Sequence, residues 1–157
     1  MRSPMIIMVA LGSVLGSGCT TLKPALVTEC RMPRNPRPDH SGAPALVGLE
    51  YGERASPIPL DSVQFSSMEA ARSLSIQRLS AVRTPTNTVE VAARFVSCQN
   101  KAFAVRVRTS FMDASQAPTE QASAWQTVYL QPHLTAAYTE RSLSTKVANY
   151  LIEIMPQ

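Results

Sequence analysis

The chain has 157 residues, of which 45% are hydrophobic and 17% are charged, and its formal net charge is +4 at pH 7. This length suits one domain and a tether, and the composition is that of an ordinary globular protein. The sequence has no block of Lys or Arg and no helix with a basic stripe, so the mild positive charge does not point to nucleic acid as a partner.

Residues 1–18 have the pattern of a lipoprotein signal peptide. Arg2 supplies one positive charge, and an apolar run follows over 5–15. A membrane-spanning helix needs about 20 apolar residues, so this run is too short to span a bilayer. Small residues at 16–18 then lead directly to Cys19. This arrangement resembles the lipobox of bacterial lipoproteins. The resemblance implies that the Cys19 sulfur receives a diacylglycerol, that cleavage occurs before it, and that the new amine is acylated, commonly with palmitate.

One residue departs from the usual lipobox, which has Leu three places before the cysteine. Gly16 stands there, and Leu15 lies one place early. The alternative is an ordinary signal peptide followed by an unrelated cysteine. Two or more acyl chains hold a protein firmly on a membrane. Thr20 replaces the Asp that usually retains such proteins at the inner membrane, so the resemblance implies an outer-membrane anchor facing the bacterial periplasm.

Residues 19–60 are rich in Pro and Gly and show no apolar periodicity, which predicts an extended tether. Within it Arg31, Arg34 and Arg37 recur every third residue. Polyproline II has three residues per turn, so these arginines would share one face. That face could contact an anionic partner, or the segment could be a solvated spacer, and we favour the spacer.

The three cysteines limit the possible disulfides. If Cys19 carries lipid, Cys30 and Cys98 are the pair left in an oxidising compartment. The alternative is two free thiols. A Cys30–Cys98 bridge would fix the tether arginines close to the 97–101 turn and create one anionic-partner surface.

Residues 61–157 are predicted to form the folded domain. Ser67 and Glu69 suggest the start of a short helix over 67–74. Strand patterns dominate the rest. The predicted strands cover 73–82, 88–97, 102–112, 124–132, 134–143 and 147–155. This series indicates a mainly β fold, an antiparallel Ig-like β-sandwich with one short helix.

The second and third of these strands alternate strictly, and a hairpin closed around Asn100 would place Phe95 opposite Val105. Both apolar sets then lie on one face, as a sheet register requires. The other face would carry Arg94, Arg106 and Arg108. We expect that face to be solvated, with an anionic-partner surface as the alternative.

Trp125 follows a polar loop over 113–123 and opens a strand. A single Trp at such a place usually closes one end of a sandwich core, and a ligand platform is the alternative.

The segment 89–154 contains the motifs "FMD" and "SAWQ", with Phe111, Asp113, Ser123, Trp125 and Gln126 at their key positions. These residues resemble the YcfL-like family of small bacterial lipoproteins. Departures are the Met inside the first motif and Cys-Gln in the preceding turn. The resemblance implies an Ig-like sandwich on an outer-membrane lipoprotein and no enzymatic activity.

Motifs for catalysis, metal binding or cofactor binding are missing from the sequence. Its two histidines have no ligand at metal-site spacing, and it lacks a nucleophile elbow and a phosphate-binding glycine loop. We therefore expect a non-catalytic interaction or structural component of a cell-envelope complex, such as secretion, pilus or cell-wall machinery, without cofactor or metal. The alternative is a binding module for peptidoglycan or another anionic envelope ligand.

Overall fold

A computed structural model describes residues 42–53 and 62–157. They form eight strands and one helix in this order: β1 (Ala45–Leu46), β2 (Val63–Phe65), α1 (Met68–Ser73), β3 (Leu74–Arg83), β4 (Val89–Ser97), β5 (Phe103–Met112), β6 (Gln126–Leu130), β7 (Thr135–Arg141) and β8 (Asn149–Pro156). All six predicted strands and the predicted helix are present, with ends within a few residues of the expected ones.

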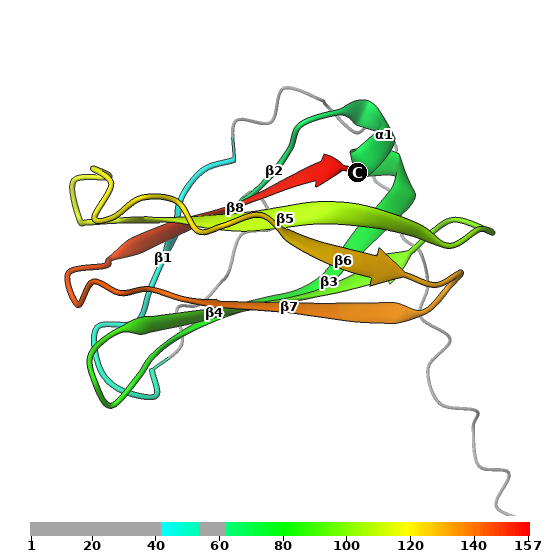
Figure 1. Ribbon diagram of the computed structural model, residues 1–157. Helices are drawn as coiled ribbons and strands as arrows, with labels where there is room; N and C mark the ends of the chain where they lie inside the picture. The colour runs from blue at the N-terminus through cyan, green and yellow to red at the C-terminus, as the bar shows by residue number, and fades with distance from the viewer. Residues whose placement is uncertain (1–41, 54–61) are drawn as a thin grey trace, which may run out of the picture.

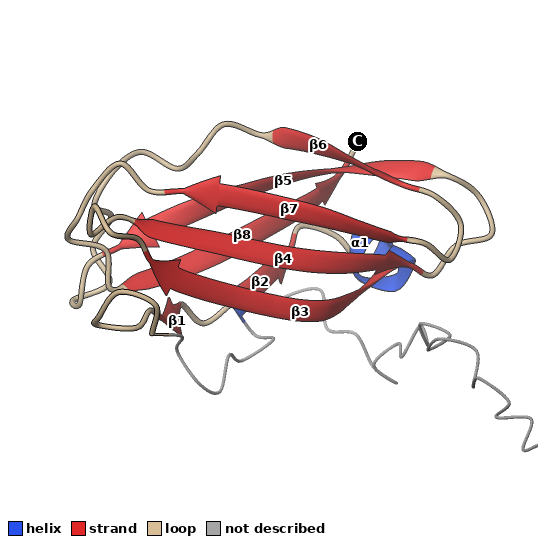
Figure 2. Ribbon diagram, turned by 90° about the horizontal axis from the view of Figure 1, so that it is seen from below, coloured by secondary structure: helices blue, strands red, loops and turns tan. Residues whose placement is uncertain are grey.

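The strands form two sheets packed face to face (Figure 1). One sheet has the order β1-β8-β5-β6, with β2 also pairing with β8, and the other has the order β3-β4-β7. Figure 2 shows the three-strand sheet in front of the larger one. The predicted antiparallel β-sandwich with one short helix is thus confirmed. One strand pair differs, because β2 runs parallel to β8.

The core fills the space between the two sheets with side chains that alternate along their strands. On β4, Val89, Val91 and Phe95 are 0% exposed. On β5, the inward side chains include Val107 at 0% and Phe111 at 1%. The inward faces read from the sequence are therefore the ones that the fold buries.

The predicted hairpin between β4 and β5 is wrong. β4 pairs with β3 and β7, whereas β5 pairs with β6 and β8. The turn over 98–102 carries the chain from one sheet to the other. The same residues of β4 and β5 point inward whether the two strands are neighbours in one sheet or face each other across the core. The alternation in the sequence therefore does not distinguish the two arrangements. The pairing partner of Phe95 is Ala136 on one side and Ile76 on the other.

Part of the segment that the sequence places in the tether belongs to the sandwich. Ala45 and Val47 are 1% and 5% exposed and lie in the core cluster. β1 pairs with β8, and the Val47 amide donates to Ala148 O at 3.0 Å. Residues 45–47 therefore pack against β8 and the residue that precedes it.

The helix α1 is short and sits at one end of the sandwich, beside the end of β8 (Figure 1). The Ser67 side chain accepts from the Ala70 amide at 3.2 Å, which caps the helix as the sequence predicts. Ala70 and Ala71 are buried, and Leu74 then begins β3. The helix closes this end of the core.

Arg83 closes the opposite end of the sandwich from a buried position, 6% exposed. Its Nε donates to Gly48 O at 2.9 Å, and its Nη2 donates to Val147 O at 2.7 Å. Nη1 lies 3.3 Å from Asn87 O and 3.4 Å from Thr145 O. One guanidinium therefore joins three segments that are distant in sequence.

Gly48 is required where Arg83 holds it. A Cβ atom at Gly48 would collide with Glu53 O, which is a backbone atom and cannot move aside easily. A larger residue would therefore push the 48–53 loop away from the Arg83 guanidinium.

Candidate functional site

The outer surface of the larger sheet carries a cluster of aromatic and charged side chains, which we call the Arg–Trp face. Its members come from β5, β6 and β8 and from the residue before β6. They are Arg106, Arg108, Trp125, Thr127, Tyr129 and Glu153.

A register irregularity precedes β6, next to Trp125. Gln126 pairs with Val107, yet the Ser123 amide donates to Thr109 O at 2.9 Å. The chain passes through three residues from Gln126 back to Ser123, but through only two from Val107 to Thr109 on β5. One extra residue therefore lies before β6, as in a β-bulge. Trp125 lies in this extra step and is half-buried, with its ring centroid 4.4 Å from the Arg108 Cζ atom. The favoured interpretation of Trp125 as a core plug is therefore wrong, because its ring packs on the outer face.

Arg108 is fixed by an acidic neighbour on β8. Its Nε donates to Glu153 Oε2 at 2.7 Å and its Nη2 donates to Glu153 Oε1 at 3.0 Å. The hydrogen bonds that Arg108 donates to Glu153 raise the pKa of Arg108 above its ordinary value. Ser110 Oγ also donates to Glu153 Oε2, at 3.3 Å. This bidentate pair holds the guanidinium under Trp125, which favours a rigid platform.

Arg106 lies at the centre of the Arg–Trp face. It pairs with Thr127 on one side and Met155 on the other, and its Cζ is 5.6 Å from the Trp125 ring centroid. That distance allows a cation–π contact. Within the described part of the chain, the Arg106 side chain makes no hydrogen bond or ion pair. Tyr129, two residues from Thr127, is 72% exposed.

Arg94 does not join this face, which corrects the predicted surface of Arg94, Arg106 and Arg108. Arg94 is exposed on β4, opposite Arg78 and Ala137, on the outside of the other sheet. The two sheets separate it from Arg106 because β4 and β5 do not form a hairpin. Tyr129 and Glu153 were not among the residues expected at this surface, although their outward positions in alternating strands were a usable signal in the sequence.

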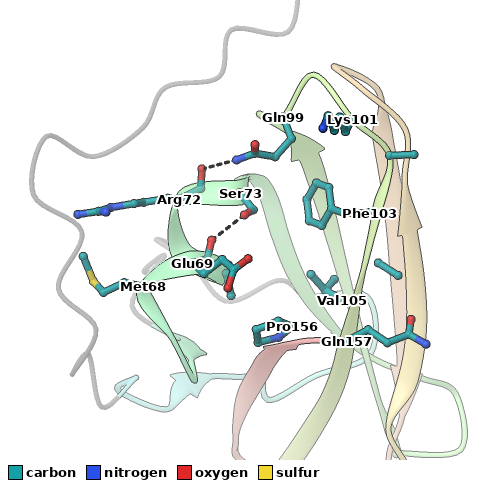
Figure 3. A pocket seen from close by; sticks show the side chains of 13 residues that line it. Met68, Glu69, Arg72, Ser73, Gln99, Lys101, Phe103, Val105, Pro156 and Gln157 are labelled. Carbon is teal, nitrogen blue, oxygen red and sulfur yellow. Dashed lines mark hydrogen bonds between the residues drawn. The ribbon is translucent and has the colours of Figure 1, made fainter.

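A groove of ≈ 940 Å³ lies at the α1 end of the sandwich. Figure 3 shows Phe103 and Val105 on one side and the helix on the other, with Lys101 and Gln99 on the rim. Gln99 Nε2 donates to Arg72 O at 3.5 Å and thereby links the rim to the helix. The charged lining residues come singly, so the groove lacks a matched acid–base pair.

Cys98 lies beside this groove and is disulfide-bonded. Within 42–53 and 62–157 the sequence has no second cysteine, and the other two cysteines of the chain are Cys19 and Cys30. Both lie outside the described residues, as do Arg31, Arg34 and Arg37 and the whole of 1–41. The pairing with Cys30, the lipidation of Cys19 and the tether surface stay predictions.

Among the described residues, no three His, Cys, Asp or Glu side chains are grouped so that they could hold a metal ion. His133 Nε2 lies 2.9 Å from Asn100 Oδ1, which joins two turns. In the described part of the chain, no helix has the length and apolar character needed to cross a bilayer.

The fold and the Arg–Trp face together define a β-sandwich protein with a preorganised outer surface. No protein-family model matches the chain. No curated protein matches it either. Among solved structures, the chain is similar to cj0090 of Campylobacter jejuni, with a TM-score of 0.52 and 11% identity over 61% of this chain and 98% of that one. It is also similar to a DUF1425 family member from Shewanella sp. pv-4, with a TM-score of 0.47 and 11% identity over 52% of this chain and 75% of that one. At this identity the likeness concerns the fold alone.

Proposed function

We propose that this protein is an outer-membrane lipoprotein of the YcfL-like type whose sandwich docks a protein partner in the periplasm. In this role it is a non-catalytic component of a cell-envelope complex. The lipobox-like sequence at Cys19 supplies the anchor, and the sandwich supplies the docking surface. Two acyl chains or more are enough to hold such a domain on a membrane.

The Arg–Trp face is the observation that carries the docking role. Trp, Tyr and Arg are the residue types that dominate binding energy at protein interfaces. Here Trp125 and Arg108 are held in place before any partner arrives, by the stacking contact and the Glu153 pair. Preorganisation lowers the entropic cost of binding.

A protein partner also fits the surface better than a glycan does. A sugar platform uses an aromatic ring face that is open to the ligand, and Trp125 is half-buried with two guanidiniums stacked near it. Tyr129 is the exposed aromatic side chain of the face and stands beside Thr127 on β6. Its ring and hydroxyl suit the mixed apolar and polar contacts of a protein interface.

The anchor is tested by Cys19→Ser in the full chain. We expect the variant to keep its signal peptide and to leave the outer-membrane fraction. A variant that still fractionates with outer membranes at the wild-type size would contradict the lipid anchor.

The docking surface is tested by photocrosslinking in living cells. A photoreactive residue at position 129 should give a discrete protein adduct. The matched control is position 139, because Thr139 is exposed on the outside of the opposite sheet. Equal adducts from both positions, or none from position 129, would contradict docking through the Arg–Trp face.

A further inference from the structure

We infer that the Arg–Trp face recognises a carboxylate on an acidic segment of the partner protein, and that Arg106 is the residue that binds it. This inference rests on the proposed docking role and names the chemistry of the partner.

The face has two arginines and one acidic side chain. Glu153 occupies the fork of Arg108 through two hydrogen bonds of 2.7 and 3.0 Å. No second carboxylate of the described residues pairs with Arg106. The face therefore keeps one unneutralised positive charge, which is complementary to an acidic group on a partner.

Arg106 is also positioned for that role. It lies on the central strand β5, between Met155 of β8 and Thr127 of β6. Its Cζ atom lies 5.6 Å from the Trp125 ring centroid, while the N–H donors of its guanidinium have no acceptor within the described chain. A planar guanidinium with free donors matches a carboxylate in a bidentate pair, and cation–π contact restricts its orientation.

The neighbours of Arg106 define what should flank the carboxylate. Thr127 offers a hydroxyl, and Met155 offers an apolar surface on the other side. Tyr129 lies opposite the small side chain of Ala104, so its exposed ring is accessible to a partner on the outer surface of the sheet. The fitting partner segment thus has Asp or Glu next to an aliphatic or aromatic residue.

The test uses the full chain in cells, with the photoreactive residue at position 129 as the probe. Arg106→Gln should lower the adduct yield by at least about tenfold, the factor expected from losing a hydrogen bond to a charged group. Arg94→Gln is the matched control and should leave the yield unchanged, because Arg94 lies on the other sheet. Both variants should keep the wild-type urea midpoint, since neither side chain makes a hydrogen bond in the described chain.

A charge exchange completes the test. Mass spectrometry of the adduct identifies the crosslinked peptide, and its acidic residue is replaced by Arg in combination with Arg106→Glu. Recovery of the adduct by this pair, with loss in each single variant, supports the inference. A peptide without Asp or Glu, or an unchanged yield with Arg106→Gln, overturns the carboxylate and leaves the docking role intact. An adduct that lysozyme digestion releases as glycan overturns both, as does the absence of any adduct from the unaltered face.

Discussion

Replacing Arg83 by Met should cost more stability than any other change to a charged residue in the described chain. The Met side chain keeps an unbranched apolar stem and removes the guanidinium. Two short hydrogen bonds are lost, to Gly48 O at 2.9 Å and to Val147 O at 2.7 Å, together with the longer contacts to Asn87 and Thr145. The carbonyl groups then lose a charged donor at a site that is only 6% exposed.

The magnitude follows from those two short bonds. A hydrogen bond to a charged group contributes about 1.5–3 kcal/mol, so the loss of two should be about 3–6 kcal/mol. With a urea dependence of about 2 kcal/mol per M, the midpoint should fall by roughly 2 M. Arg78→Met is the matched control on the same strand. Arg78 is exposed, so its replacement should change the free energy of unfolding by less than about 0.5 kcal/mol.

The assay is urea unfolding followed by far-UV circular dichroism, with Arg83→Lys as an intermediate case. Lysine keeps the charge but has no planar fork to reach carbonyls on opposite sides, so we expect a loss between those of the Met variant and the control. A midpoint shift below about 0.5 M for Arg83→Met would refute the view that this guanidinium joins the three segments.

Three further predictions concern the core and one loop. Phe95→Ala should cost about 3–5 kcal/mol in urea unfolding, because it removes a side chain that is 0% exposed, and a cost under about 1 kcal/mol would contradict its burial. Tyr138→Phe should cost about 1–3 kcal/mol, because the buried Thr109 hydroxyl loses its 2.9 Å partner. The same change at the exposed tyrosine of β6 should cost nothing measurable, and equal effects would rule out the bond. The Ser115 hydroxyl lowers the pKa of Asp113 from 3.8, so this carboxylate stabilises the loop above pH 3.8 and the effect is lost as the pH falls through the lowered value. Thermal melts of wild type and Asp113→Asn should therefore converge below pH 3.8, and a constant difference from pH 6 to pH 2 would contradict this role.

The sequence was sufficient for the strands and their inward faces, because period-2 alternation depends only on burial on one side. It was insufficient for the strand partners. The alternation around Phe95 is the same whether β5 lies beside β4 in one sheet or across the core in the other sheet. The five-residue turn between them is long enough for both arrangements. β1 and β2 have two and three residues, too few to show a period.

The candidate site was only partly predictable for a related reason. Arg106 and Arg108 were correctly expected on one face, because they are two residues apart in the same strand. Assigning Arg94 to that face depended on the incorrect hairpin. Trp125 lies two residues before Thr127, so alternation along β6 already places it on the outer face, and the core-plug interpretation relied on residue type and overlooked this alternation.

The place of β8 in the larger sheet has a consequence for how the protein is made. β8 separates β5 from β1 and β2, and it follows all of them along the chain. The larger sheet therefore cannot assemble on a growing chain until residues 149–156 have been synthesised. Pairings so distant in sequence also form slowly, because the loop must close before any contact is gained. For a protein exported as we propose, slow formation of these pairings favours a chain that is still unfolded when it crosses the membrane.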